Sequence, residues 1–498
     1  MRKLLITFVL LASQFANVSV SSATSGEAQR NLGATKRIYS QFLSSPTPNV
    51  AGLTLFINLM PKGGDVHHHF SGSIYAETYL DWAKENGFCI YNKTDPQLGI
   101  VQYRVETKPA ELTGAKLDAC LSIDAVLKND LFYRNLLMEW SSKDYANHYH
   151  QQTPPDKHFF DTFRYFENIS PYGYRSGLEL LKRRAKEENV SYIETMLKSG
   201  PSINAPELAS AFKSINSNSS VAETQSAMIQ AYTFLKNNAE VKEKIESYIK
   251  LVETASEGLD DDSFRLRFLA YSSRNSSPEV VFSRLYSSFS AASQSNKIVG
   301  VNFVGPENHQ IAMRDYSLHM QMLDFLGKQF PQSKLSLHAG ELVLGMVPPE
   351  GLRFHINEAV TIAHANRIGH GIDIAHEKNA PALLSYMAKN RIPVEINLTS
   401  NKDILGVSEG YHPLLLYKKY NVPFVISTDD PGVSRNNLSG EYLIYVKTFR
   451  PSYEDLKKTV YSSIQYSFLS EAEKKNEVKK LDQKFLEFES RMAEIPSK

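Results

Sequence analysis

The sequence has almost no excess of charge of one sign. Its 498 residues include 55 Lys and Arg against 54 Asp and Glu, which gives a formal net charge of +1 at pH 7. The charges are scattered along the chain rather than gathered in blocks. Because nucleic acids and anionic membrane surfaces are bound by clustered positive charge, the sequence argues against both partners. It favours a small neutral substrate.

Apart from one stretch at the N-terminus, the sequence has no apolar run long enough to span a membrane. The one candidate lies at the N-terminus, where Arg2-Lys3 precedes the apolar run Leu4–Ala12 and the small residues Ser21-Ser22-Ala23. This order is typical of a secretory signal peptide that is cleaved after about residue 23. A membrane anchor, the alternative, needs about 20 apolar residues, and Ser13 and Gln14 interrupt this run. We expect a soluble, secreted or periplasmic protein that has no membrane partner once the signal is removed.

Cysteine is scarce, with only Cys89 and Cys120 in the whole chain. In an oxidising compartment, two thiols this close in sequence favour a disulfide that closes a local loop. The alternative is a pair of buried free thiols.

The chain has neither internal repeats nor low-complexity linkers, so its organisation is read from composition and hydrophobic pattern. After the signal peptide at 1–23, residues 24–58 indicate a helical extension that is broken at Ser45–Pro48. The remainder, 59–498, would form the main domain, and the apolar run Leu53–Met60 at its start leads into three histidines. Residues of about 85–135 hold both cysteines and many turn formers, which indicates a small insertion after the first strand.

From there, short β-branched runs alternate with longer amphipathic segments, which is typical of parallel α/β folds. Together with the strand that leads into His67, seven runs complete a set of eight and predict a (β/α)₈ TIM barrel. The predicted strands are Ser191–Thr195, Arg265–Tyr271, Ile298–Val304, Lys334–His338, Arg367–His370, Val394–Leu398 and Val422–Thr428. The clearest helical segments are Val241–Ser256, Met313–Gln329 and a C-terminal stretch over Tyr453–Ala493.

Histidines and acidic residues follow several of these runs, where a TIM barrel carries its active site. In an extended segment, His67 and His69 project to one face while His68 points away. With His338 and Asp429 they supply three imidazoles and a carboxylate, a donor set that suits a catalytic zinc ion with an open position for water. The alternatives are surface histidines and, at Asp429, a capped turn.

Four segments resemble the signature set of the adenosine deaminase family, in the same order. They are Met60–Gly72, Leu337–Glu341, Arg367–Gly371 and Ser427–Pro431. The signal peptide and the cysteine-bearing insertion also resemble the family's secreted, growth-factor-related branch. That branch is often dimeric through its N-terminal helices, which implies a homodimer for this chain.

The resemblance implies a role for each matching residue. His67, His69, His338 and Asp429 would bind one zinc ion per subunit, and Glu341 would move a proton to N1 of the purine. His370 and Asp430 would orient the attacking water, and Asp430 would also contact the substrate. The backbone N–H of Gly305 would meet the purine ring. The family usually has Asp where this chain has Ser71, a position associated with the ribose, so recognition of the sugar is the open point.

Hydrolytic deamination fits these residues chemically. Zinc lowers the pKa of a bound water to about 7, which makes a nucleophile available at neutral pH. Attack at C6 of adenine builds negative charge toward N1, so an acid beside N1 is needed. The expected reaction converts adenosine and 2′-deoxyadenosine into inosine or deoxyinosine and ammonia. The aromatic segment His158–Phe163 could wall a purine pocket or belong to the core, and Glu194 could support the site or simply end a strand.

Three other functions remain open at this point. A two-metal barrel amidohydrolase generally uses a bridging lysine on the fourth strand, and Ile298–Val304 contains none. A deaminase of another aminopurine is a closer rival, although no basic phosphate cradle is evident that would favour nucleotides. A secreted binding or signalling protein could use the barrel as a scaffold for the insertion.

Overall fold

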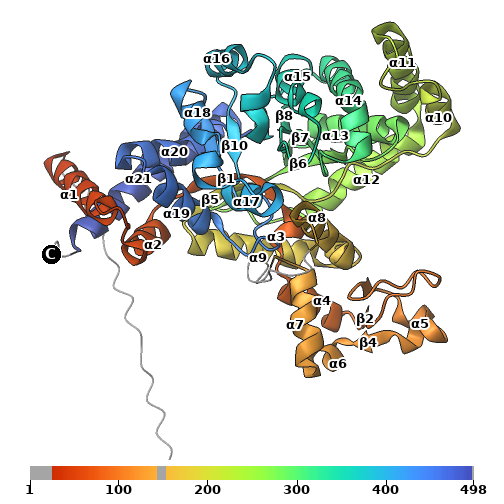
Figure 1. Ribbon diagram of the computed structural model, residues 1–498, viewed down its shortest axis with the longest axis horizontal. Coiled ribbons are helices and arrows are strands. Elements are labelled where there is room, and N and C mark those ends of the chain that lie inside the picture. The colour runs from red at the N-terminus through yellow and green to blue at the C-terminus, as the bar shows by residue number, and fades with distance from the viewer. Residues whose placement is uncertain (1–24, 143–152, 496–498) are drawn as a thin grey trace, which may run out of the picture.

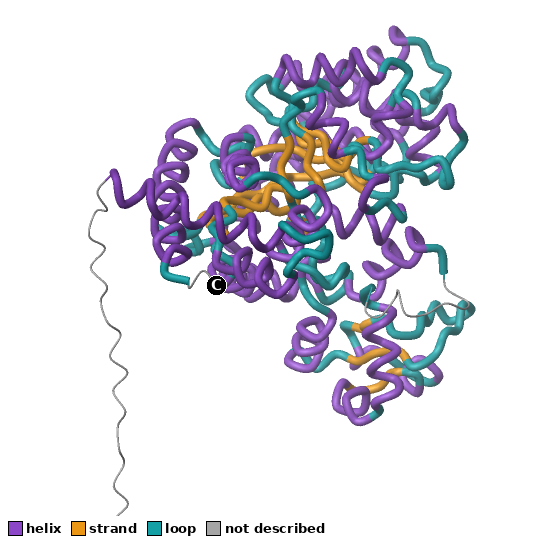
Figure 2. The backbone as a smooth tube through the Cα atoms, turned by 60° about the vertical axis from the view of Figure 1, so that its left-hand side comes forward, coloured by secondary structure: helices purple, strands orange, loops and turns teal. Residues whose placement is uncertain are grey.

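The computed structural model describes residues 25–142 and 153–495. Over these residues, eight parallel strands form a nearly closed barrel with helices around it (Figures 1 and 2). The strands follow one another in the order β1 (Gly63–His69), β5 (Val190–Met196), β6 (Arg265–Ser273), β7 (Ile298–Val304), β8 (Leu335–Ala339), β9 (Arg367–His370), β10 (Val394–Ile396) and β11 (Phe424–Ile426). The predicted (β/α)₈ barrel is therefore confirmed.

The barrel closes between its first and last strands just beyond the end of β11. The backbone N–H of His69 donates to the carbonyl of Asp429 over 2.8 Å, and the N–H of Asp429 donates to the carbonyl of His67 over 2.9 Å. Two of the three segments that carry the predicted metal ligands are thus held together by the backbone itself.

The strands are buried because helices cover the outside of the barrel. All seven residues of β5 are buried, and β9 and β10 are buried throughout. The helices that follow β1 in the barrel are α8 (Pro155–Phe166), α9 (Tyr174–Glu187), α10 (Pro206–Phe212), α11 (Val221–Asn237), α12 (Ala239–Ser256), α13 (Pro278–Gln294), α14 (Gln310–Gln329), α15 (His355–Thr361), α16 (Ala380–Asn390), α17 (Leu398–Leu405), α18 (Leu414–Lys419), α19 (Leu438–Phe449), α20 (Tyr453–Gln465) and α21 (Glu471–Ala493). Short 3₁₀ helices lie in the connections, at Pro109–Glu111, Ser170–Gly173, Pro349–Leu352, Ile372–His376 and Glu409–Tyr411.

One local reading of the sequence was wrong. The sequence predicts the apolar run Leu53–Met60 to be the first strand, which leads into the three histidines. Most of this run instead lies in helix α2 (Val50–Leu59), which is capped by the side chain of Asn49. The histidines are themselves the last three residues of β1. A short apolar run is compatible with a buried helix or a buried strand, so periodicity could not separate the two.

The N-terminal helices pack against the C-terminal ones. Helix α1 (Ser25–Leu43) lies beside α21, and α2 lies beside α19 (Figure 1). Tyr39, Phe56, Tyr453 and Phe488 join them, with ring centroids 5.0 to 6.0 Å apart in four contacts. The two ends of the chain therefore share one core on the outside of the barrel.

The insertion forms a small unit at the lower right of Figure 1. It follows α3 (Phe70–Ser73) and α4 (Ala76–Glu85). An antiparallel sheet runs in the order β3 (Val105–Glu106), β2 (Cys89–Tyr91) and β4 (Cys120–Ser122), flanked by α5 (Ala115–Asp118), α6 (Ile123–Lys128) and α7 (Asp130–Glu139). A disulfide joins Cys89 to Cys120, with a Cα–Cα distance of 5.5 Å, so the two thiols are paired rather than free.

The proposed signal peptide at 1–23 lies outside the described residues. Within the described ranges, no helix combines the length and the apolar character needed to span a membrane.

Candidate metal centre and active site

The four predicted ligands meet at the C-terminal end of the barrel. His67 and His69 come from β1, His338 from β8 and Asp429 from the connection after β11. His68, between the first two, faces the other way, and its Nδ1 lies 2.9 Å from Thr195 Oγ1. The alternation expected of a strand thus turns two of the three histidines into the site.

The spacing of the donor atoms fits one zinc ion. Asp429 Oδ1 lies 3.2 Å from His67 Nε2 and 3.1 Å from His69 Nε2. His69 Nε2 lies 3.3 Å from His338 Nε2. Bonds of about 2.0–2.1 Å at tetrahedral angles place donors about 3.3 Å apart. These three spacings are compatible with a zinc ion bound by three imidazoles and a carboxylate.

Hydrogen bonds at the far side of two rings leave the inner nitrogens free to bind a metal. His67 Nδ1 lies 2.6 Å from Glu395 Oε2, and His338 Nδ1 lies 2.8 Å from Asn302 Oδ1. In a neutral ring whose Nδ1 donates to such an oxygen, Nε2 carries a lone pair toward the site, as a metal ligand does. His67 Nε2 is buried and has no hydrogen-bond partner in the described structure, which is what a ligand atom requires.

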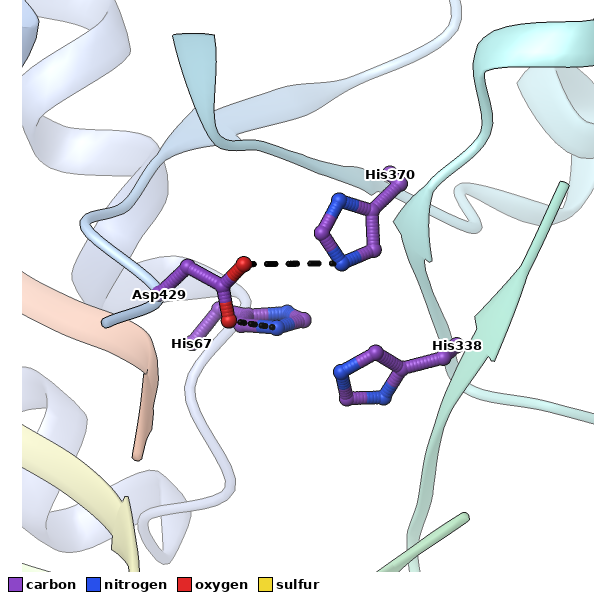
Figure 3. Close-up of side chains that lie close together, drawn as sticks. All are labelled: His67, His338, His370 and Asp429. Atoms are coloured by element: carbon purple, nitrogen blue, oxygen red, sulfur yellow. Dashed lines mark ion pairs between the residues drawn. The ribbon is translucent and has the colours of Figure 1, made fainter. Parts of the chain in front are cut away.

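His370, at the end of β9, lies in the same cluster. Its Nε2 is 3.9 Å from Asp429 Oδ2, and its ring centroid is 5.0 Å from that of His67 (Figure 3). His67, His338, His370 and Asp429 by themselves form a group that could hold a metal, as do His69, Asp429 and Asp430. Proximity alone therefore does not separate His370 from the ligands.

Glu341 is held close to this cluster by a second buried carboxylate. Glu307 accepts the backbone N–H of Gly340 over 3.0 Å and that of Glu341 over 2.9 Å. Burial raises the pKa of Glu341 well above its usual value, and the charges of Asp429 and Glu307 act in the same direction. In this setting the Glu341 carboxyl holds a proton that it could donate.

Asp430 lies next to Asp429 and is equally enclosed. Its Oδ1 is buried without a hydrogen-bond partner, and burial together with the neighbouring Asp429 raises its pKa well above the usual value. Gly72 faces it, and a Cβ at that position would overlap the Asp430 carboxyl group. Glycine is therefore needed in the first motif so that Asp430 can reach the cavity.

These residues line a cavity of about 350 Å³ at the mouth of the barrel. Three phenylalanines of α8 form one wall, so the aromatic segment at 158–163 does contribute to the pocket. Among the described residues, the lining contains no Lys or Arg. It consists of His69, Ser71, Phe159, Phe160, Phe163, Met196, Tyr271, Val304, Gly305, Pro306, His338, Glu341, His370, Ile404, Asp429 and Asp430.

The structure thus brings all the predicted site residues to one place. Ser71 and Gly305 both line the cavity, and Gly305 has a φ of +100°, a conformation that favours glycine. His67 is the one predicted ligand that does not line it, because it is fully buried behind the other donors.

Several supporting residues could not be identified from motifs. Glu395 orients His67 and is itself bonded to Arg367, whose guanidinium also donates to Glu194 over 2.6 Å. Glu194 therefore supports the site rather than merely ending a strand. The available signal was an acidic residue within otherwise apolar runs, as in Val394–Ile396, since buried charges need partners.

An eight-stranded parallel barrel with a histidine and carboxylate cluster at its C-terminal mouth defines the class of metal-dependent hydrolases. The model of the family described as adenosine deaminase matches residues 231–484, slightly more than half of the chain. The chain belongs to the adenosine deaminase family, and it contains a buried histidine and carboxylate cluster that is compatible with a metal ion.

Individual relatives agree with this family. Adenosine deaminase of Vibrio cholerae serotype O1 is 32% identical over 184 residues, which are 37% of this chain and 50% of the relative. The chain thus matches about half the length of that relative.

Two solved structures have a similar fold. Adenine deaminase from Arthrobacter aurescens has a TM-score of 0.52 at 16% identity and covers 85% of this chain and 98% of its own. The N6-methyl-AMP deaminase from Arabidopsis thaliana has a TM-score of 0.54 at 18% identity, with 86% and 98% covered. At these identities the likeness concerns the fold.

Proposed function

We propose that this protein catalyses zinc-dependent hydrolytic deamination of adenosine and 2′-deoxyadenosine. The observation that carries the proposal is the set of donor distances of 3.1 to 3.3 Å that link Asp429 to His67 and His69, and His69 to His338. The buried carboxyl group of Glu341 lines the same cavity. A zinc ion bound by these residues would lower the pKa of a water molecule to about 7.

Glu341 supplies the acid in this proposal. Attack of water at C6 of the purine moves negative charge onto N1, and a carboxyl group that holds its proton can donate it there. The cavity buries the Glu341 carboxyl, and Glu307 fixes its backbone. Once it has given up the proton, the same carboxylate can take one from the water and pass it to the leaving ammonia.

His370 and Asp430 would direct the water toward C6. Both side chains line the cavity, and each has a buried polar atom without a partner, Nε2 in His370 and Oδ1 in Asp430. Gly305 lines the same cavity, where its backbone N–H could meet a ring nitrogen of the purine. The phenylalanines of α8 offer an apolar face for the base to pack against.

The lining favours a neutral nucleoside over a nucleotide. A phosphate group calls for Lys or Arg, and the cavity lining has neither among the described residues. One structural relative is named for a nucleotide substrate, N6-methyl-AMP, and another for the free base adenine. Ser71 takes the place of an acidic residue, so we expect weaker selection at the sugar.

The secreted, growth-factor-related branch remains our proposal for the place of this chain within the family. It rests on the sequence at 1–23, on the disulfide-bonded insertion and on the paired N-terminal helices. We propose in addition that the protein is secreted or exported to the periplasm, and that it forms a homodimer through α1 and α2.

The direct test is an ultraviolet assay of the purified protein with adenosine, 2′-deoxyadenosine, adenine and AMP in parallel. We expect turnover of the two nucleosides, little turnover of AMP, and a loss of at least about 100-fold in Glu341→Gln. The exposed Glu243→Gln on α12 provides a control with the same chemical change. A preference for adenine or AMP would show that the proposed substrate is wrong. If the zinc-loaded protein turned over none of the four compounds, the binding and signalling role would be favoured instead.

A further inference from the structure

The proton positions on His370 can be worked out from its neighbours. A neutral imidazole carries one proton, and the partner of one nitrogen decides which nitrogen has it. His370 Nδ1 lies 3.0 Å from Asn401 Nδ2. Its Nε2 lies 3.9 Å from Asp429 Oδ2 and has no hydrogen-bond partner in the described structure. The question is whether the atom of Asn401 that faces the ring is the nitrogen or the oxygen, since an amide can be turned over.

A chain of hydrogen bonds that begins at a backbone N–H answers this question. The N–H of Leu414 can only donate, and it donates to His412 Nδ1 over 3.1 Å. His412 Nδ1 is therefore an acceptor, and the proton of a neutral His412 must lie on Nε2. That Nε2 lies 3.2 Å from Asn401 Oδ1, so the atom of Asn401 that faces His412 is its oxygen. Its nitrogen then faces His370.

His412 is neutral because it is buried. It is 3% exposed, and burial lowers its pKa to about 4. Asn401 is fully buried in α17, and a second amide nitrogen, Asn397 Nδ2, lies 3.5 Å from His370 Nδ1. Glu341 Oε1 lies 3.6 Å from the same atom, beyond hydrogen-bond distance. The strongest partner of His370 Nδ1 is thus a donor, so the ring proton lies on Nε2.

This pattern is the reverse of that in two of the ligands. Glu395 and Asn302 present oxygens to Nδ1 of His67 and His338. The orientation of Asn302 is fixed in turn, because its Oδ1 also accepts the backbone N–H of Phe303 over 2.6 Å. His67 and His338 therefore turn a lone pair toward the site, whereas His370 turns an N–H toward it.

We propose that Asn401 and His412 are positioning residues that hold His370 as the Nε2–H tautomer, which excludes it from metal binding and makes it a hydrogen-bond donor to the oxygen of the attacking water. The inference about the donor rests on the proposed function, whereas the tautomer itself does not. Although His370 belongs to the same cluster as the ligands, its N–H cannot coordinate a metal. The hydrogen bonds from His412 through Asn401 to His370 thus assign different roles to histidines of the same cluster. His67 and His338 bind the metal, and His370 donates a hydrogen bond.

The test is ¹⁵N NMR of the full-length protein labelled at histidine, without metal and loaded with zinc. The resonances of His370 are assigned by their loss in His370→Gln. We expect a pyridine-type shift at Nδ1 and a pyrrole-type shift at Nε2 in both states. A pyrrole-type Nδ1, or a His370 Nε2 that shifts as a zinc ligand does, would overturn the proposal whether or not the protein deaminates adenosine.

The variant Asn401→Asp tests the hydrogen-bond chain from His412 through Asn401 to His370. A carboxylate accepts from both neighbours, so we expect the pyrrole-type shift to move to Nδ1 of His370. We also expect kcat to fall about 10- to 100-fold with a smaller change in KM, while the zinc content stays the same. The control is Asn237→Asp, an exposed position at the end of α11. An Asn401→Asp protein with the wild-type His370 spectrum and kcat would refute the role of Asn401, and the wild-type spectrum remains decisive if this variant does not fold.

Discussion

Two residues of the site adopt a backbone conformation that side chains usually avoid. His370 has a φ of 66° and Asp429 a φ of 63°, although neither is glycine. Such a conformation costs on the order of 1–3 kcal/mol and persists where the surroundings enforce it. For Asp429 the enforcing contact is the closure of the barrel, through its N–H bond to the carbonyl of His67. At these two positions the strain accompanies the placement of an imidazole and a carboxylate at the cavity.

Glu307 provides a sharp test at the scale of single residues. Its two oxygens accept the N–H groups of Gly340 and Glu341, and the neighbouring Arg274 donates to the carbonyl of His338 over 2.7 Å. In Glu307→Gln, an NH₂ group would face one of these N–H groups. Losing a buried hydrogen bond of this kind costs about 1–3 kcal/mol, so we expect kcat/KM to fall about 5- to 150-fold.

Steady-state kinetics and zinc analysis of Glu307→Gln check this expectation. The zinc content should stay at the wild-type level, since Glu307 contacts the backbone beside Glu341 rather than the donors. A wild-type kcat/KM in this variant would show that the hydrogen bonds from the Gly340 and Glu341 N–H groups to Glu307 do not position Glu341.

For single residues, the sequence predicts the site residues that lie within recognisable motifs. It misses the residues that orient those site residues through hydrogen bonds. His67, His69, His338 and Asp429 converge as expected because they lie at the C-terminal ends of strands of one barrel. Glu307, Glu395 and Asn302 could not be found in the same way, since their roles depend on which backbone or ring nitrogen they face.

Among the secondary-structure elements, the small sheet of the insertion depends on the disulfide. Cys89 and Cys120 lie on paired strands and close a loop with a sequence separation of 31. By the loop-entropy argument, such a link stabilises by about 3–4 kcal/mol. In the double variant Cys89→Ser, Cys120→Ser we expect faster proteolysis within 92–119 and kcat/KM within about 2-fold of wild type. Limited proteolysis beside a deaminase assay would decide the matter, and loss of activity without new cleavage would mean that the insertion shapes the pocket.

Helix α19 carries a buried acid that makes stability depend on pH. Burial raises the pKa of Glu441 to about 8, although it accepts hydrogen bonds from Asn436 and from the N–H of Thr399. Its pKa in the unfolded chain is about 4.3. Between these values the folded state binds more protons, so the free energy of unfolding falls as pH rises, by at most about 1.4 kcal/mol per pH unit from this group.

Glu441→Gln should remove this contribution. Denaturant unfolding from pH 5 to 8 should therefore give a smaller loss of stability with pH in the variant than in the wild type or in Glu243→Gln. Parallel pH dependences in all three proteins would rule out Glu441 as the group responsible.

Strands are the elements that the sequence predicts best. β7 and β9 have the predicted bounds, and the others differ mainly at their ends. The C-terminal stretch proves to be two helices, because Ser470 begins α21 with a capping box that includes Glu473. Helix α2 is the clearest miss, since a short, mostly apolar run before a turn gives no decisive periodicity.

For the whole molecule, the family and the fold agree, while the substrate rests on the contents of one cavity. The barrel positions its donors through strands that are far apart in sequence. His67 and Asp429 are separated by 362 positions in the sequence and are brought together where β1 closes onto the end of β11. No local motif could establish that contact, and only the assumption of a closed barrel made it predictable.

The central claim is that His67, His69, His338 and Asp429 hold one zinc ion that the deamination of adenosine requires. The most direct measurement is a titration of the metal-free protein with zinc, followed by the initial rate of inosine formation. The account predicts no activity without metal and a linear rise to a plateau at one equivalent per chain. Full activity of the metal-free protein, or a plateau only at two equivalents, would contradict it.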